Sequence, residues 1–276
     1  MNGTDTSARS PSVVSREADA RFRALAARWG LRPENRWIGG SVEHAWRQTR
    51  HVFEHFGLPI EDARVLEVGC YMGGTATVLA TLGARVTAVD VDPASLEIAR
   101  VNAERYGASA IRFEHVTDLA HLPFREGEFD AAVCYGVLEY VPHAKLGRIK
   151  AEVARTVRGG GVIWVGGTSG RLWPREVHSR RWLTNYVPRV VDSARAPTRA
   201  PQRGLWPWEV RRGFGPCENL DFLDRGERFL AAARGRGMGS AKLAALRLGI
   251  PLGRAVGIWT GLLLPAMSVR LRKKRA

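Results

Sequence analysis

Short apolar runs alternate with segments of helical periodicity along the middle of the chain. Residues 64–68 and 85–90 are rich in β-branched apolar side chains and predict buried strands. The segments after them carry apolar residues at helical spacing, and Pro93 stands at a favourable first helical position. A third strand is predicted over residues 111–115. Strands that alternate with helices favour an α/β fold with a doubly wound sheet.

The residues before this core have a different character. Residues 1–15 are polar and without periodicity, which predicts a disordered tail that lacks the apolar core of a signal peptide. We therefore expect a cytoplasmic protein. Residues 17–29 and 41–56 show helical periodicity and predict two cap helices within residues 16–60. At 276 residues and 45% hydrophobic content, the chain is long enough for one sizeable domain with elaborations.

A glycine-bearing turn joins the first strand to the next helix. Gly69 lets the backbone turn sharply, and Gly73 and Gly74 open the helix without a Cβ that would obstruct a ligand at its N-terminus. Asp90 closes the second strand about 20 residues later, a spacing at which a carboxylate reaches ribose hydroxyls. The turn and the acid together predict an adenosine-binding βαβ unit.

This turn resembles the E/D-x-G-x-G-x-G motif of the class I S-adenosylmethionine-dependent methyltransferases. Glu67 takes the acidic position, whereas Tyr71 stands where the family usually has glycine. A dinucleotide fingerprint would need G-x-G-x-x-G instead. The resemblance implies that Glu67 lies near the cationic amino-acid tail of the cofactor. Tyr71 predicts either a wider turn or a ring that covers the cofactor.

The resemblance continues downstream. Residues 129–134 resemble the family's fourth strand, residues 136–141 the loop after it, and residues 155–165 the helix end, glycine turn and fifth strand. The resemblance implies that Asp118 accepts a hydrogen bond from the adenine amino group. The full set of cofactor contacts that it implies is Glu67, Gly69, Cys70, Tyr71, Gly73, Asp90, Val91, Asp118, Leu119 and Tyr135.

An insertion crowded with aromatic, proline and arginine residues is predicted over residues 168–218. Its first part resembles a segment that forms a lid over the acceptor in some small-molecule methyltransferases. Trp173, Trp182 and Tyr186 are the candidate acceptor contacts, because aromatic rings suit a planar or apolar acceptor and attract a sulfonium. The alternative is that these rings pack an accessory subdomain.

A general base is needed only where the acceptor loses a proton as it attacks. Glu139, Tyr140 and His143 follow the predicted fourth strand, and His178 lies in the insertion. These four residues are the catalytic candidates. A histidine titrates near neutral pH, so His178 is the most informative of them. A structural or solvent-facing histidine is the alternative interpretation.

The net charge of +15 raises the question of a nucleic-acid partner. Most of the 42 basic residues are arginines in a chain rich in alanine and glycine, a composition that biased codon usage also produces. Cys134-Tyr135-Gly136-Val137 stands where amino-methylating DNA enzymes carry N/D-P-P-Y/F. We expect a small-molecule acceptor and no nucleic-acid partner, with RNA methylation as a minor alternative.

Metal binding is not expected from the sequence. Residues 51–55 match the H-x-x-E-H string of inverzincins, and two histidines at i and i+4 can share a metal. The sequence offers no apparent third ligand, so helix-surface histidines are favoured. Cys70, Cys134 and Cys217 lack C-x-x-C spacing and indicate free thiols.

A helical extension is predicted over residues 219–276. Within it, residues 255–269 are uncharged and largely apolar, and a basic tail follows. This stretch is shorter than the about 20 residues that a spanning helix needs. Two interpretations remain open: a buried helix, or an interfacial helix that makes peripheral membrane contact through its basic tail.

The sequence therefore predicts a Rossmann-like core over residues 61–167, with N-terminal cap helices, an insertion and a helical C-terminal extension. The expected activity is S-adenosylmethionine-dependent methyl transfer to a small, hydrophobic or aromatic metabolite of natural-product type. A lipid-linked or quinone-like acceptor at the membrane surface is the first alternative. A nicotinamide-dependent oxidoreductase and a noncatalytic cofactor-binding subunit are more distant ones.

Overall fold

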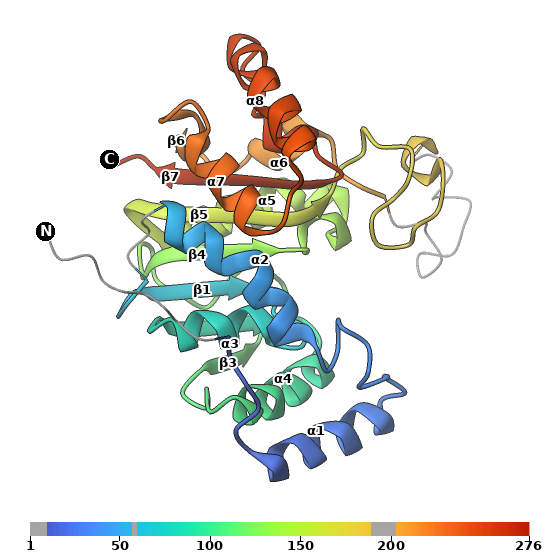
Figure 1. Ribbon diagram of the computed structural model, residues 1–276. Helices are drawn as coiled ribbons and strands as arrows, with labels where there is room; N and C mark the ends of the chain where they lie inside the picture. The colour runs from blue at the N-terminus through green and yellow to red at the C-terminus, as the bar shows by residue number, and fades with distance from the viewer. Residues whose placement is uncertain (1–9, 57–59, 189–202, 276) are drawn as a thin grey trace, which may run out of the picture. The chain divides into compact units, whose positions relative to one another are not determined.

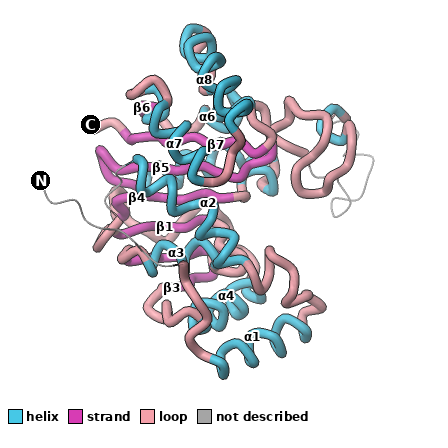
Figure 2. Tube along the Cα trace, in the orientation of Figure 1, coloured by secondary structure: helices cyan, strands magenta, loops and turns pink. Residues whose placement is uncertain are grey.

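The computed structural model describes residues 10–56, 60–188 and 203–275. The chain divides into two compact units, one up to His115 and one from Val116 onward. Residues 1–9 of the predicted tail and residues 189–202 of the predicted insertion lie outside the described residues. The α/β fold of Rossmann-like type predicted from the sequence is confirmed, with strands and helices alternating along both units (Figures 1 and 2).

The first unit is built on three parallel strands in the order β3-β2-β1. Its elements are α1 (Arg16–Arg28), α2 (Ser41–Phe56), β1 (Arg64–Val68), α3 (Gly74–Thr81), β2 (Arg85–Asp90), α4 (Pro93–Arg105) and β3 (Arg112–His115). Val65, Leu66 and Val68 of β1 are buried, as expected for a strand covered on both faces. Parallel neighbours need crossover connections, and α3 and α4 supply them.

The two N-terminal helices pack on the crossover helices. Helix α1 contacts α4, and α2 contacts α3. Ser15 caps α1 by accepting a hydrogen bond from the backbone N–H of Ala18. Just before it, the backbone N–H of Val14 donates to the carbonyl of Arg105, so the described end of the predicted tail is attached to α4.

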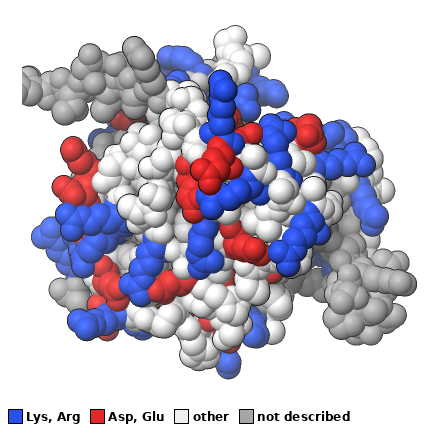
Figure 3. Space-filling view, turned by 90° about the horizontal axis from the view of Figure 1, so that it is seen from below, with Lys and Arg blue, Asp and Glu red and all other residues white. Residues whose placement is uncertain are grey.

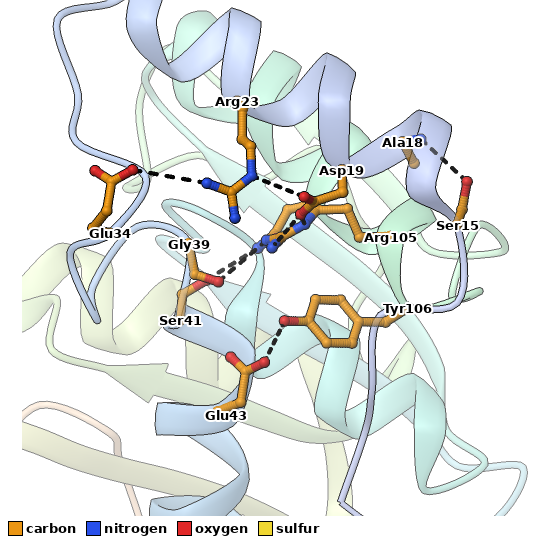
Figure 4. A network of polar contacts seen from close by, with 11 residues as sticks. Ser15, Ala18, Asp19, Arg23, Glu34, Gly39, Ser41, Glu43, Arg105 and Tyr106 are labelled. Carbon is orange, nitrogen blue, oxygen red and sulfur yellow. Dashed lines mark hydrogen bonds and ion pairs between the residues drawn. The ribbon is translucent and has the colours of Figure 1, made fainter.

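A buried arginine organises these contacts (Figure 4). Arg105 lies 2.8 Å from Asp19 of α1, and it donates to the carbonyl of Gly39 and to the side chain of Asn102. Its guanidinium also lies 4.2 Å from the ring centre of Phe22. Because a buried charge is costly without partners, this set of contacts fixes α1 and the segment before α2 against α4.

The second unit has four strands in the order β4-β5-β7-β6. Its strands are β4 (Phe129–Tyr135), β5 (Val157–Ser169), β6 (Cys217–Asn219) and β7 (Ala266–Lys273), and its α-helices are α5 (His143–Thr156), α6 (Pro207–Arg211), α7 (Glu227–Gly235) and α8 (Ser240–Ala255). Short 3₁₀ helices cover Leu138–Tyr140 (η1), Thr184–Tyr186 (η2), Leu220–Phe222 (η5) and Thr260–Leu263 (η6). Strand β5 runs parallel to β4, whereas β7 is antiparallel to both β5 and β6.

The prediction of a helix over residues 255–269 is wrong. Helix α8 ends at Ala255, and the chain then forms η6 and β7, which pairs with β5 on one side and β6 on the other. The apolar residues Met267, Val269 and Leu271 alternate along β7 and are buried, which is the period of a strand. The interfacial-helix interpretation of this segment is therefore also wrong. None of the helices described is long and apolar enough to cross a bilayer.

An ion pair is formed by the middle of β7, the strand that the sequence did not predict. Arg270 of β7 and Asp221 of η5 have fully buried side chains, and the Arg270 Nε atom donates to Asp221 Oδ1 at 2.6 Å. The backbone N–H of Arg270 donates to the other carboxylate oxygen at 3.0 Å. The sequence showed Arg270 only as part of a basic tail, and its partner lies 49 residues away.

We expect Asp221→Asn to lower the free energy of unfolding by about 3–5 kcal/mol, because it leaves the buried Arg270 charge without its counterion. The matched control is Glu218→Gln, which removes an exposed carboxylate of β6 that lies 3.9 Å from Arg272 of β7. That change should cost less than about 1 kcal/mol. Urea denaturation of the two variants measures both effects. Equal losses would show that burial does not govern this pair.

Candidate functional site

The turn after β1 has three left-handed residues within a short stretch. Gly69 has φ 72°, Tyr71 φ 46° and Gly73 φ 68°. The backbone N–H groups of Gly69 and Cys70 both donate to the carbonyl of Val89 on β2. Glycine adopts this conformation readily, and Tyr71 adopts it at a cost. The tyrosine therefore occupies the glycine position in a left-handed conformation, and the residue is 47% exposed.

Asp90 binds the backbone of this turn. Its Oδ2 accepts from the backbone N–H of Tyr71 at 2.8 Å, and its Oδ1 accepts from the backbone N–H of Asp92 at 3.0 Å. Each carboxylate oxygen has further lone pairs, so the group retains acceptor capacity for ribose hydroxyls. The sequence predicted Asp90 as a ligand contact. The structure adds that it also shapes the turn.

Asn102 holds the turn from the opposite side. Its amide donates to the carbonyl of Met72 at 2.6 Å and to the hydroxyl of Ser41 at 3.0 Å, and its own oxygen accepts from Arg105 at 2.8 Å. The contacts around Arg105 thus extend into the cofactor turn. Sequence reasoning missed Asn102, which carries no motif signal.

The two glycines that open α3 are explained by packing within the unit. A Cβ on Gly74 would lie 2.7 Å from the carbonyl oxygen of Ser41 at the start of α2. A Cβ on Gly73 would lie 3.1 Å from the Cβ of Ala99 and 3.3 Å from the ring of Phe113. The sequence attributed both glycines to ligand clearance. Gly74 instead allows α2 to approach α3.

Glu67 is buried beneath the first turn of α3. Its carboxylate accepts from the backbone N–H of Ala76 and from the Thr75 side chain, and among the described residues its Oε2 has no hydrogen-bond partner. Burial, reinforced by the charge of Asp90, raises the pKa of Glu67 to about 8. An orphaned carboxylate oxygen fits the ammonium of an amino-acid tail, as the resemblance implies.

The remaining first-unit candidates flank these groups. Cys70 is buried and burial raises the pKa of its thiol, so its backbone is the part suited to a ligand. Val91 is half exposed directly after Asp90. With Glu67, Asp90 and the left-handed turn, these residues fit an adenosine and amino-acid cofactor.

Three predicted cofactor contacts belong to the second unit. The carboxylate of Asp118 accepts from the backbone N–H of Ala120 at 3.2 Å and from Lys145 Nζ at 3.4 Å, and the pKa of Asp118 is lowered by these contacts. Leu119 beside it is buried. Tyr135 packs against Trp164 in a tilted arrangement with ring centres 5.6 Å apart, and burial raises the pKa of Tyr135 to about 12. These assignments stay predictions.

Glu139 and His178 form a close pair in the second unit. The Glu139 side chain is fully buried in η1, and its Oε1 lies 2.7 Å from His178 Nε2. The same oxygen accepts from the backbone N–H of Ser169 at the end of β5. Burial alone would lower the pKa of His178, but the hydrogen bond and charge of Glu139, with the charge of Glu176, outweigh it and raise that pKa.

A second carboxylate, which sequence reasoning missed, fixes the histidine's backbone. Glu176 is buried and its Oε2 accepts from the backbone N–H groups of His178 and Ser179. Burial tends to raise the pKa of Glu176, and these hydrogen bonds, together with that of Ser169, lower it overall. The only sequence signal was an acid two positions before the candidate histidine.

The other two catalytic candidates differ. The ring of Tyr140 lies 5.7 Å from that of His178, so it belongs to the same group, although it is exposed. His143 does not pair with this group, because its Nε2 lies 2.6 Å from Glu209 Oε1 of α6. The structure thus brings together Glu139, Tyr140 and His178.

The predicted acceptor aromatics lie on the surface of the insertion. Trp173 and Tyr186 are partly exposed and bind backbone carbonyls, of Leu263 and Leu172 respectively. Trp182 is 66% exposed beside Arg175. None of the three lines the described cavity of the second unit, which measures about 1090 Å³ and is lined by Trp208, Arg211, Val256, Ile258 and Leu262, among others.

His51, Glu54 and His55 lie close together on α2. Their ligand atoms lie within 4.8 Å of one another, and His51 Nδ1 is 2.9 Å from Glu54 Oε2. The sequence had identified no third metal ligand. In the structure Glu54 lies close enough to His51 and His55 to act as one. His51 Nε2 also accepts from Arg50 Nε at 3.3 Å, so ordinary hydrogen bonds account for the arrangement.

Basic residues are interspersed with acidic ones on the face shown in Figure 3. On that face the Lys and Arg side chains do not collect into one basic patch.

Comparison with known proteins identifies the core. Residues 65–161 match the family model described as "Methyltransferase domain". A ubiquinone biosynthesis O-methyltransferase of Xanthomonas euvesicatoria is 34% identical over 143 residues, covering 50% of this chain and 56% of that protein. The chain thus spans about half the length of the curated relatives that it matches.

Solved structures agree on the fold. A Galdieria sulphuraria protein described as a sarcosine dimethylglycine methyltransferase has a TM-score of 0.52 at 14% identity, covering 94% of this chain and 98% of its own. An S-adenosylmethionine-dependent methyltransferase of Methanosarcina mazei has a TM-score of 0.50 at 16% identity, covering 78% of this chain and 94% of its own. The family model thus confirms the predicted methyltransferase domain over residues 65–161, and the solved structures support its fold. The residues assigned to the S-adenosylmethionine site stay predictions.

The left-handed Tyr71 generates a stability prediction. Tyr71→Gly and Tyr71→Ala remove the same ring, but only glycine relieves the backbone cost, so the glycine variant should be more stable by about 0.5–1 kcal/mol. Val91, which does not have positive φ, is the control. There the alanine variant should be more stable than the glycine variant. Urea denaturation measures both pairs. An alanine variant as stable as glycine at position 71 would contradict the argument.

The raised pKa of Glu67 predicts a pH dependence. Because the folded carboxyl holds its proton to about pH 8 and the unfolded one releases it near 4.5, the folded state binds more protons between these values. The free energy of unfolding should therefore fall as pH rises from 4.5 to 8. Glu67→Gln should flatten this slope, whereas the exposed Glu61→Gln should leave it unchanged. Urea titrations across this pH range measure the slope of the free energy of unfolding against pH. Equal slopes in the wild type and both variants would refute the prediction.

Proposed function

We propose that the whole chain is an S-adenosylmethionine-dependent methyltransferase that methylates an ionisable oxygen or nitrogen of a small, hydrophobic or aromatic metabolite. The observation that carries the proposal is the buried Glu139 bound to His178. A histidine held by a buried carboxylate, with its backbone fixed by Glu176, is suited to proton transfer. It lies in a chain whose core is a methyltransferase domain.

The cofactor supplies the activated methyl group, and the chain supplies positioning and proton transfer. Glu67 and Asp90 would hold the amino-acid tail and the ribose. His178 would take the proton of the attacking O–H or N–H group. Glu139 would orient the imidazole and stabilise the imidazolium, which is consistent with the raised pKa of His178.

The acceptor class follows from this chemistry. A base is useful for a phenol or another hydroxyl, which must lose its proton as it is methylated. The curated relative acts, by its name, in ubiquinone biosynthesis as an O-methyltransferase, which favours a quinol-like acceptor as a second candidate. A noncatalytic subunit would have no use for a preorganised base, and a nicotinamide enzyme would require a different turn.

The base assignment is tested by kinetics with labelled S-adenosylmethionine and a panel of phenols and quinols. His178→Ala should lower kcat by about 100-fold or more, with cofactor affinity unchanged. The acidic limb of the wild-type pH profile should lie above pH 6.5, because the pKa of His178 is raised. Glu139→Gln should move that limb downward.

His143→Ala is the control, since His143 pairs with Glu209 instead. It should retain near-normal kcat. If His178→Ala turns over like wild type, or if His143→Ala loses as much, the assignment of the base is wrong.

Cofactor binding is tested separately by calorimetry with S-adenosylhomocysteine. Asp90→Ala should weaken binding by at least about 100-fold, because hydrogen bonds to a charged acceptor contribute about 1.5–3 kcal/mol each. Asp92→Ala is the control. It removes the side chain that caps α4 by accepting from the backbone N–H groups of Ala94 and Ser95. This variant should lose about 1 kcal/mol of stability and keep normal cofactor affinity. If NAD stabilises the protein and S-adenosylmethionine does not, the cofactor assignment is wrong.

A further inference from the structure

Helix α8 exposes its apolar residues to solvent. Leu248, Leu252 and Val256, the last at its C-cap, are 80%, 69% and 62% exposed. The buried side of the helix carries Leu243, Leu246 and Ile250, and α8 contacts α7 and η6 there. A surface helix ordinarily presents polar residues on its outer side. Figure 1 shows α8 projecting from the rest of the second unit.

The exposed apolar residues form one continuous stripe. With 3.6 residues per turn, positions 241, 244, 245, 248, 251, 252, 255 and 256 fall within an arc of about 140°. All eight are alanine, leucine, proline or valine, and all are exposed. We call these eight positions the α8 stripe. Single exposed leucines are common, but a continuous stripe marks an interaction surface.

Basic residues border the stripe on both sides. Lys242 lies at one border, and Arg247 and Arg254 lie at the other, by the same helical geometry. All three are exposed, and residues 240–256 contain no aspartate or glutamate. Arg247 forms an ion pair with Glu227 of α7 at 2.6 Å, so the basic borders rest on Lys242 and Arg254. Long basic side chains at the edges of an apolar face can extend their charges toward a polar surface while their stems cover apolar area.

Further apolar and basic groups lie at the C-terminal end of α8. The cavity described above begins there, with Val256 and Ile258 in its lining together with Trp208, which is 47% exposed. Arg211 and Arg212 also line it, and Arg211 donates to the carbonyl of Gly257 at 2.8 Å. The apolar surface with a basic rim thus extends beyond the helix.

We propose that the α8 stripe binds an anionic membrane surface, with α8 lying in the plane of the interface. The apolar residues would enter the boundary between headgroups and acyl chains, and the bordering cations would meet lipid phosphates. A second copy of this chain is disfavoured as the occupant, because it would bring the same basic borders and a net charge of +15. The proposal goes beyond methyl transfer and does not depend on it.

The test is flotation of the full chain with vesicles of phosphatidylcholine containing 30% phosphatidylglycerol. The wild type should float with them at low salt. The triple variant Leu248→Ser/Leu252→Ser/Val256→Ser should bind at least tenfold more weakly. Its melting temperature should remain close to that of wild type, because the three side chains are exposed. Leu223→Ser, at an exposed leucine elsewhere in the second unit, is the matched control and should bind normally.

The charges are tested in the same assay. Lys242→Ala/Arg254→Ala should weaken binding and reduce its salt dependence. Binding of the triple variant equal to wild type would overturn the proposal, and so would equal, salt-independent binding to pure phosphatidylcholine. Dimerisation in solution that the triple variant abolishes, without vesicle binding by wild type, would show instead that the stripe joins two copies of the chain.

Discussion

The cofactor turn depends on a chain of buried polar contacts that begins at Arg105. Arg105 binds Asp19 and Asn102, and Asn102 in turn binds the carbonyl of Met72 inside the turn. A buried guanidinium must be satisfied on several sides, so the groups around it cannot move independently. From the other side, Asp90 accepts the backbone N–H of Tyr71. Left-handed residues at 69, 71 and 73 are thus held between α4 and β2.

The second unit uses buried charge in a different way. Asp221 and Arg270 fix a strand, whereas Glu139 and Glu176 fix a histidine that remains partly open to solvent. In the first case both partners are inaccessible and the pair serves structure alone. In the second case the carboxylates are buried and the imidazole is 22% exposed. Partial exposure next to a buried anion is what proton transfer to a ligand requires.

Local signals in the sequence were sufficient to predict the strands and the cofactor turn of the first unit. The strand at 64–68, the turn and Asp90 lie close together in the chain, and their spacing carried the prediction. Non-local pairs were harder to predict. Glu139 and His178 could each be proposed, but their contact is formed between segments 39 residues apart. The roles of Asn102, Glu176 and Gly74 depend on neighbours that no local motif specifies.

The wrong prediction of a helix over residues 255–269 and the failure to predict the α8 stripe have the same origin. An apolar run shows that residues avoid water, but it does not reveal which face is covered. Residues 266–273 form a strand because, without it, one edge of β5 would be open and β6 would have no partner among the described strands. Helix α8 presents leucines to solvent because its other side is already packed. Hydrophobic content alone therefore indicated neither the strand nor the exposed face.

The position of β7 has a consequence for the order in which the chain can fold. The helices and strands of the first unit are contained within residues 16–115, so the β1–β2 and β2–β3 pairs and the helices packed within that unit can form once this segment has been synthesised. Strand β6, in contrast, precedes β7 in the chain yet pairs with it, and β5 waits about 100 residues for the same partner. Long sequence separation slows the formation of such contacts. During synthesis, one edge of β5 stays open until the ribosome has delivered β7, and this interval is when the nascent chain is most exposed to mispairing with other strands.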